Sequence, residues 1–451
     1  MNFLKQSDNC RFSNKTILLF VLPIFLEQIM IAFIGIADTY MVSSFGEAAV
    51  AGVSLVTSID KFVKSIFTGL AAGASVVISQ YIGADDKSNA SKSMKTGIQI
   101  LFLMTIVISA LMIIFKRPVL NLLFGAVEKD VMDSSIKYFS ISAFSYPFVS
   151  LFSVGCSSYR AMGNSRITFY ASLLMLGINL VLKYIFIYHL DMGVTGAGLS
   201  SLIAYGIVAV ILIVSLHNTD NKVHLDKIYA FEGTKKMIMS IFGIGIPNGI
   251  ENGMFQLGHI LLQNLMSTLG TVAIAANALY SNLSPLYHSL NSGFSLGITT
   301  FVAQCMGAGK PDEARYYMRH ILKLTYVFTA VNGIIVIILS KPLISIYGLS
   351  QEVTNVGHKL LLIYLSGAII AYPSSFTLAN GLRGTGDTKF TMTVSMLSMF
   401  GVRIGLAYIA VYVFKMGVYG VQLVMVLEWF EKGIIYHIRE RRGKWQNIKV
   451  I

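Results

Sequence analysis

Two carboxylates interrupt an apolar stretch that is long enough to cross a bilayer. Glu27 and Asp38 lie within residues 16–40, and a spanning helix needs about 20 apolar residues at a rise of about 1.5 Å each. The two acids are eleven residues apart, so at roughly 100° per residue they return to nearly the same helix face. Because an ionisable group is costly at mid-membrane, such groups usually mark an ion or substrate path.

The chain repeats itself. Adding 224 to the numbers of several residues between 23 and 83 gives the matching positions in the second half, with no gap. Pairs related in this way are Pro23 with Pro247, Glu27 with Glu251, Gly69 with Gly293, and Gln80 with Gln304. The chain is therefore two copies of one unit, and the first acid is present in both copies.

Composition sets the class of protein. The chain has 451 residues, of which 55% are hydrophobic and only 13% charged, whereas a soluble domain averages roughly 25% charged. The sequence therefore predicts a polytopic membrane protein. The net charge of +13 fits cytoplasmic loops rich in Lys and Arg better than it fits a nucleic-acid partner.

Apolar periodicity predicts an all-α protein with twelve transmembrane helices, arranged as two six-helix lobes around a central cleft. Both copies have an even number of spans, so they run in the same direction across the membrane as a 6+6 parallel repeat. The predicted parts are an N-terminal lobe (1–216), a cytoplasmic linker (217–236) and a C-terminal lobe (237–451). The expected helices are 16–42, 50–82, 94–115, 131–159, 166–189, 194–216, 237–266, 274–306, 317–340, 353–381, 389–414 and 417–438.

Charge bias predicts the orientation. The loops and adjoining helix ends on the side of the two termini contain 23 Lys and Arg residues, and those on the other side contain 7. Positive loops face the cytoplasm, so we expect both termini there, in a multi-pass protein of the plasma membrane.

Several motifs taken together resemble the MATE (multidrug and toxic compound extrusion) family. They cover nearly the whole chain, in order and at the usual length of the family. These motifs are Ala37-Asp38-Thr39, Ser79-Gln-Tyr-Ile-Gly83, Gly245-Ile-Pro-Asn-Gly-Ile-Glu251-Asn252, Arg383-Gly-Thr-Gly-Asp387-Thr388 and Arg439-Glu-Arg-Arg-Gly-Lys-Trp445.

The resemblance implies an antiporter that couples inward flow of H⁺ or Na⁺ to export of amphipathic drugs or metabolites. We expect a secondary transporter rather than an enzyme, with no cofactor and no bound metal. The expected partners are a small-molecule substrate and the lipid bilayer, and we expect a monomer. The sequence has no GxxxxGK[ST] motif for ATP, so an ion gradient is the expected energy source.

The functional positions of the family carry over unevenly. In the branch that uses the N-terminal lobe, the resemblance assigns the cation site to Asp38, Asn179 and a hydroxyl that Ser201 could supply. A second acid of that branch is replaced here by Lys183, which puts a Na⁺ site in doubt. In another branch a helix-seven acid, matched by Glu251, works with a helix-ten acid, where this chain offers Tyr372.

Each candidate residue could instead have a purely structural role. Asp38 could form a proton switch with Lys183, because protonation of the acid would break the pair, or it could merely bond a neighbouring helix. We favour the switch, and H⁺ over Na⁺. Glu27 and Glu251 each follow a proline by four residues and could serve function or satisfy backbone groups near a bend; for Glu251 we favour function.

Charged residues elsewhere in the spans bear on substrate charge. Asp60 and Lys64 share a helix face as an i,i+4 pair, which favours an internal salt bridge, although Lys61 or Lys64 could instead face the cleft and suit anionic substrates. Three bases balance three acids in the N-terminal spans, which argues against a purely cationic substrate. We interpret Arg403 and the Glu428/Lys432 pair as structural.

Two other functions compete with multidrug export. One is a flippase or exporter of lipid-linked precursors or anionic metabolites from the same superfamily. The other is a membrane-embedded enzyme or channel, but the sequence has neither an HExxH motif nor a short pore motif in place of the duplicated unit.

Overall fold

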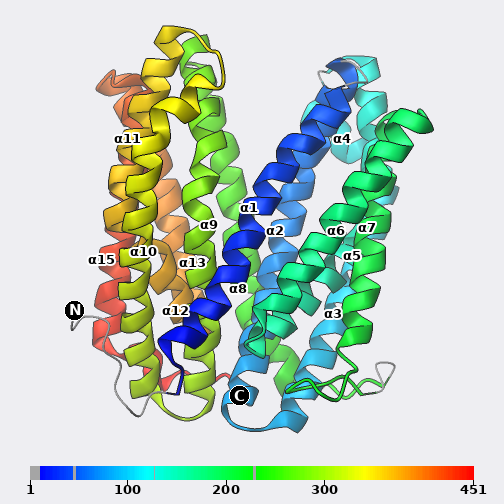
Figure 1. The fold of residues 1–451 in the computed structure, drawn as a ribbon, viewed down its shortest axis with the longest axis vertical. Helices are drawn as coiled ribbons and strands as arrows, with labels where there is room; N and C mark the ends of the chain where they lie inside the picture. Colours follow the sequence, from blue (N-terminus) through cyan, green and yellow to red (C-terminus); the bar gives the residue numbers. More distant parts are fainter. Residues whose placement is uncertain (1–10, 44–46, 126, 227–229) are drawn as a thin grey trace. The chain divides into compact units, whose positions relative to one another are not determined.

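The computed structural model describes residues 11–43, 47–125, 127–226 and 230–451, without the side chains of residues 32–40, 42, 43, 47 and 286. Helices make up nearly all of this part of the chain, and no strand occurs in it (Figure 1). The predicted all-α membrane fold of twelve transmembrane helices in two lobes is confirmed. The central cleft remains a prediction.

The helices follow the predicted order. In the first half they are α1 (Asn14–Ser43), α2 (Glu47–Gly83), α3 (Lys87–Ile114), α4 (Lys116–Phe124), α5 (Lys129–Ala161), α6 (Ser165–Tyr184) with the π-helical turn η2 (Ile185–His189), and α7 (Gly193–Ser215). In the second half they are α8 (Lys235–Ser267), α9 (Thr271–Gly307), α10 (Pro311–Ser345), α11 (Gln351–Tyr372), η3 (Pro373–Thr377), α12 (Leu378–Gly384), α13 (Thr388–Leu397), η4 (Ser398–Gly405), α14 (Leu406–Tyr408), η5 (Ile409–Val413), α15 (Gly417–Arg442) and the short η6 (Lys444–Asn447).

Local chemistry sets several helix ends. The Asp86 carboxylate accepts from the Asn89 backbone N–H over 2.9 Å and caps α3. Ser350 caps α11 in the same way, and α10 begins at Pro311, where a missing N–H costs nothing. At the far end of α15, Gly443 adopts φ 68°, the left-handed conformation that glycine tolerates best.

Irregular turns interrupt helices that the sequence predicts as continuous. The segment predicted as 353–381 is divided by η3, which begins at Pro373, and the segment predicted as 389–414 is divided by η4 and η5. Proline removes a backbone donor and cannot continue the α-helical ladder, which accounts for η3. Such π-helical turns recur at functional positions in proteins.

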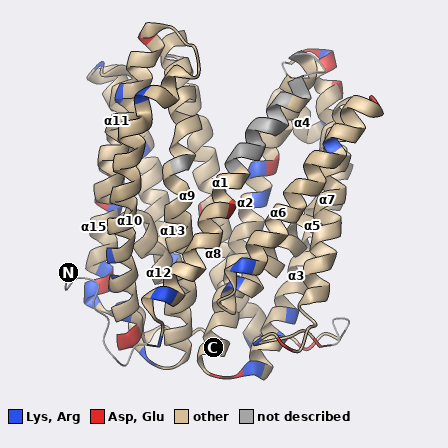
Figure 2. Cartoon of the chain, in the orientation of Figure 1, with Lys and Arg blue, Asp and Glu red and all other residues tan. Residues whose placement is uncertain are grey.

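Within the described residues, nine helical segments are long and apolar enough to cross a membrane. The helices α8, α9 and α15 are not among them. Figure 2 shows that charged residues gather mainly near helix ends, with a few in mid-helix. Polar side chains within spans face protein or water rather than lipid, and these three helices supply most of the polar wall of the cavity described below.

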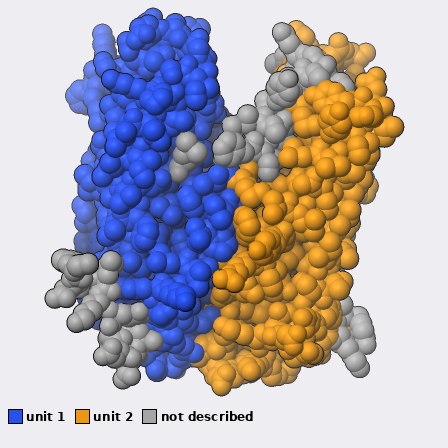
Figure 3. Space-filling model, viewed as in Figure 1, with its two compact units in different colours: residues 1–29, 254–451 blue, residues 30–253 orange. Residues whose placement is uncertain are grey.

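The chain divides into two compact units (Figure 3). Unit 1 comprises residues 1–29 and 254–451, and unit 2 comprises residues 30–253. The division by packing therefore passes through α1 and α8. The lobes predicted from the repeat, 1–216 and 237–451 with a linker at 217–236, remain a prediction about the duplicated sequence.

Unit 2 contains a close approach of two helices that only glycine permits. A Cβ at Gly69 on α2 would lie 2.4 Å from the Gly249 backbone nitrogen on α8. One turn away, a Cβ at Gly73 would lie 2.6 Å from the Cα of Gly245. Small residues let backbones meet in this way in membrane helices. The Asn252 side-chain amide also donates to the Ser65 carbonyl over 3.2 Å, so α8 before residue 254 is fixed to α2.

Unit 1 has its core around α9 and α10. Phe20 and Phe301 meet edge to face with ring centroids 5.4 Å apart, and Ile298 is fully buried beside them. The first half of α1 lies against α9, where a Cβ at Gly293 would approach Val21 to 2.9 Å. The repeat thus places Gly69 and Gly293 at corresponding helix crossings in the two units.

Candidate functional site

The predicted coupling residues of α6 and α7 form a buried polar group in unit 2. The Asn179 side-chain amide donates to the Ser201 hydroxyl over 2.9 Å. Asn179 is 5% exposed, and Lys183, one turn further along α6, is 3% exposed. Two helices therefore supply a hydrogen-bonded amide and hydroxyl next to the face that bears a buried ammonium.

The acids of α1 and α8 are also buried where they are described. Glu27 is 4% exposed in unit 1 and Glu251 is 2% exposed in unit 2. Asp38 belongs to α1, but its side chain lies outside the described residues, so the Asp38–Lys183 switch stays a prediction. Burial of Glu27 and Glu251 agrees with the cost of exposing carboxylates to lipid.

Asp60 belongs to a hydrogen-bonded cluster inside unit 2. The Ser142 hydroxyl donates to one carboxylate oxygen, and the Tyr146 hydroxyl donates to the other over 2.9 Å. Lys64 lies 3.8 Å from the same carboxylate, which is the i,i+4 pair that the sequence predicts. Lys61 is exposed. Because Asp60 is 4% exposed and tied to α5, these contacts suit a structural role.

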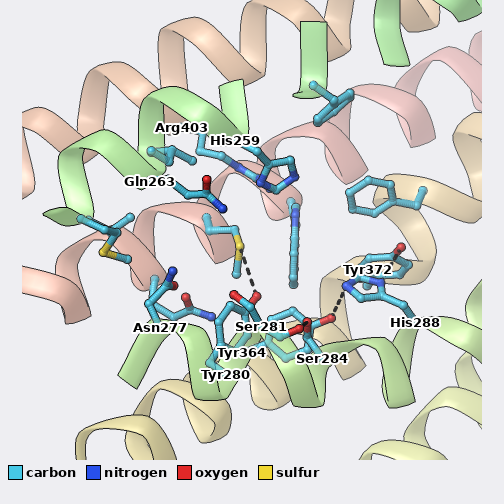
Figure 4. A pocket seen from close by; sticks show the side chains of 18 residues that line it. His259, Gln263, Asn277, Tyr280, Ser281, Ser284, His288, Tyr364, Tyr372 and Arg403 are labelled. Atoms are coloured by element: carbon cyan, nitrogen blue, oxygen red, sulfur yellow. Dashed lines mark hydrogen bonds between the residues drawn. The ribbon is translucent and has the colours of Figure 1, made fainter. Parts of the chain in front are cut away.

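Unit 1 contains a cavity of about 430 Å³ (Figure 4). Its size lies in the range of small-molecule pockets, about 300–1,000 Å³. Side chains from α8, α9, α11, η3, η4 and α15 line it. In Figure 4, Arg403, His259 and Gln263 lie on one wall, and Tyr280, Ser281 and Ser284 lie across from them.

Tyr372 occupies the position at which another branch of the family has an acid. It lines this cavity. Its hydroxyl lies 2.9 Å from His288 Nδ1, and the Tyr364 hydroxyl lies 2.5 Å from His288 Nε2. A neutral imidazole donates from one nitrogen and accepts at the other, so the two tyrosines satisfy both atoms. Tyr372 also stacks on Phe376 with centroids 4.2 Å apart. Tyr372 therefore holds His288 and Phe376 together in an aromatic part of the cavity wall.

A buried network of charges stands behind the cavity. Arg403 donates from Nη2 to one Glu428 oxygen over 2.6 Å, and Lys432 Nζ lies 2.6 Å from the other. All three side chains are at most 4% exposed. Lys432 also lies over the Phe376 ring, 4.3 Å from its centroid, a favourable cation–π contact. One carboxylate is therefore shared by two cations.

Sequence reasoning assigned Arg403, Glu428 and Lys432 a structural role and did not predict that Arg403 lines a cavity. The signal was present, since an arginine within an apolar span is costly. The polar residues of α9, such as Ser281 and His288, were also missed. Their spacing of seven residues places them on one helix face, but serine and histidine on one face do not reveal what that face contacts.

Two copies of one helical unit, each with buried ionisable side chains inside apolar spans, define a multi-pass membrane transporter. The MatE family model matches residues 23–185 and 247–409. The second matched segment begins and ends 224 residues after the first, which is the offset of the sequence repeat. The chain belongs to the MatE family, and the family predicted from the motifs is therefore confirmed.

The names of related proteins agree with this family assignment. The chain is 26% identical to the uncharacterized transporter YisQ of Bacillus subtilis over 446 residues, which cover 96% of each chain. It is 24% identical to the probable multidrug resistance protein NorM of Thermotoga maritima, covering 97% of this chain and 94% of that one.

A solved structure shows the same fold. It is described as the outward-facing conformation of a multidrug resistance MATE family transporter of the MOP superfamily. The TM-score is 0.88 at 18% identity, and the match covers 96% of this chain and 97% of the other.

Proposed function

We propose that this transporter is a proton-coupled antiporter that exports amphipathic small molecules across the plasma membrane, with both termini in the cytoplasm. Family membership supports export, and relatives such as the Thermotoga NorM are described as probable multidrug resistance proteins. Alternating access by rocking of the two repeats is the corresponding mechanism for parallel-repeat carriers.

The observation that carries the choice of ion is the buried Lys183. It lies one helical turn from Asn179 and is 3% exposed. A hard cation such as Na⁺ is bound by oxygen ligands, and an ammonium in place of an acid supplies repulsion where the family branch supplies an oxygen. A proton needs only a group that titrates.

Asp38 is the titrating group in this proposal. A carboxylate next to the Lys183 ammonium is favoured in its charged form. When a proton reaches Asp38, the attraction between the two side chains ends and α1 and α6 can separate. Release of the proton on the other side would restore the pair, so each cycle would couple one proton step to one conformational step.

Efflux of a fluorescent dye from cells that express the protein tests the proposal. We expect efflux to stop when a protonophore collapses the gradient and to continue when external sodium is removed. Asp38→Asn should abolish efflux, and Lys359→Ala, at an exposed position of α11, is the control that should retain it.

Lys183→Asp is the complementary variant, because it restores the acid of the family pattern. We expect its efflux to become dependent on sodium. Wild-type efflux that requires sodium and ignores the protonophore would contradict proton coupling, and unchanged efflux in Asp38→Asn would remove Asp38 from the mechanism.

A further inference from the structure

The cavity of unit 1 presents buried hydrogen-bond donors that have no partner among the described residues. These donors are Arg403 Nε and Trp429 Nε1, and both residues line the cavity. The residues are 3% and 2% exposed. The Gln422 amide, 3% exposed, lines the same cavity. An unpaired buried polar group is costly, and two unpaired N–H donors beside an amide favour a ligand that brings acceptors.

The charged side chain that lines the cavity is a cation, which also favours a ligand with acceptors. Among the described side chains that line it, Arg403 is the one Arg, Lys, Asp or Glu. Glu428, the acid that pairs with Arg403, also pairs with Lys432. Arg403 and Lys432 therefore share this acid, and the arginine lines the cavity.

The rest of the wall suits an apolar or aromatic body. Trp429 meets Tyr372 edge to face with centroids 5.4 Å apart, and Phe376 lies 6.0 Å from Trp429 in the same way. Met266 and Met425 complete this surface, and methionine adapts to ligands of varied shape. The hydroxyls of Tyr280, Ser281 and Ser284 also line the cavity, and hydroxyls can donate or accept.

We propose that this cavity binds an amphipathic anion, with its apolar body against Trp429 and Phe376 and its carboxylate directed at Arg403 and Gln422. A guanidinium is well suited to a carboxylate, because both groups are planar and can form charge-assisted hydrogen bonds. As the substrate class of an exporter, the inference rests on the proposed function; as a binding site, it stands without a gradient.

Binding to purified protein in detergent tests the site directly. The probes are phenylbutyrate, phenylbutanol and phenylbutylamine, which share one apolar body and differ in charge. The chain has two tryptophans, and Trp445 is fully buried near the C-terminus. A Trp445→Phe background therefore leaves Trp429 as the single fluorescent reporter in the cavity wall, and calorimetry on the unmodified chain provides a second measurement.

We expect phenylbutyrate to bind at least about tenfold more tightly than the alcohol or the amine, a factor that corresponds to about 1.4 kcal/mol. Arg403→Met should remove this preference while retaining the fold, since Glu428 keeps Lys432 as its partner. Gln422→Leu should weaken binding of the carboxylate more than binding of the alcohol. Arg439→Met, which removes a cation paired with Asp387 outside the cavity, should leave the preference intact.

Three results would overturn the inference. They are tighter binding of the amine than of the carboxylate, an unchanged preference in Arg403→Met, and no saturable binding of phenylbutyrate up to its solubility limit. Anion binding without proton-dependent export would instead contradict the proposed function and leave the site standing. Proton-dependent export without anion binding would contradict the site alone.

Discussion

Replacement of Glu428 by glutamine is the sharpest test of the charge network in unit 1. Glu428 is fully buried and lies 2.6 Å from both Arg403 and Lys432. Glutamine keeps the size of the side chain but removes the negative charge. Two buried cations are then left without their shared acid, and they repel each other.

The size of the effect follows from the distances. At an effective dielectric constant of about 20, two unit charges separated by about 2.6 Å attract with roughly 6 kcal/mol before desolvation is counted. Breaking a buried pair by removal of one partner typically costs about 3–5 kcal/mol, and here both attractions are lost. Arg403→Met leaves Glu428 paired with Lys432, so we expect a cost of no more than about 1–2 kcal/mol.

The chain offers a reporter for unit 1 alone. Its three cysteines are Cys10, Cys156 and Cys305, and Cys305 is fully buried in unit 1. In a Cys10→Ser, Cys156→Ser background, a thiol-reactive dye labels Cys305 only when unit 1 opens. With about 2–4 °C per kcal/mol for a unit of this size, Glu428→Gln should lower the labelling midpoint by about 6–20 °C and Arg403→Met by no more than about 8 °C.

The double variant distinguishes charge from packing. Glu428→Gln combined with Arg403→Met removes one of the two stranded cations, so it should be more stable than Glu428→Gln alone. Equal midpoints for the two single variants, or a double variant less stable than Glu428→Gln, would refute the reasoning that one buried acid balances two cations.

Three further outcomes can be measured by thermal unfolding in detergent. Gly69→Ala should destabilise unit 2 by about 1–3 kcal/mol through overpacking, because its Cβ would meet backbone. Gly177→Ala on α6, which has open space around it, is the control and should be neutral or stabilising. Equal effects of the two substitutions would contradict the glycine contact. The Lys95 ammonium holds the pKa of Glu232 below its usual range, so the pair stabilises the protein at neutral pH and this stabilisation is lost as pH falls through the lowered pKa. Glu232→Gln should therefore lower the melting temperature at pH 7 but not in acid. A lower melting temperature that persists in acid would argue against the ion pair. Asp60→Asn should cost about 1–3 kcal/mol through its buried hydrogen bonds yet keep dye efflux per folded molecule, and loss of efflux with an intact fold would make Asp60 functional.

Periodicity, hydropathy and the repeat predicted the fold well because they act along the whole chain. The apolar content set the membrane class, and Pro23 with Pro247 and Glu27 with Glu251 set the register of the two copies. Helix ends were less predictable, since they depend on single contacts such as the cap of α3 by Asp86.

The site could be predicted only where one residue type is unusual by itself. A carboxylate within a span, such as Glu27 or Glu251, is conspicuous at any position, and both proved buried. The cavity could not be predicted, because it is formed by residues far apart in the sequence. Only the folded chain brings His259, Ser281 and Gln422 around one cavity.

Transport by purified protein in liposomes after a pH jump tests the central claim most directly. The measurement is made with and without sodium, on matched cationic and anionic compounds. We expect substrate flux that follows the proton gradient in the absence of sodium and is lost in Asp38→Asn. Flux that follows a sodium gradient and ignores the pH jump would contradict proton coupling through Asp38.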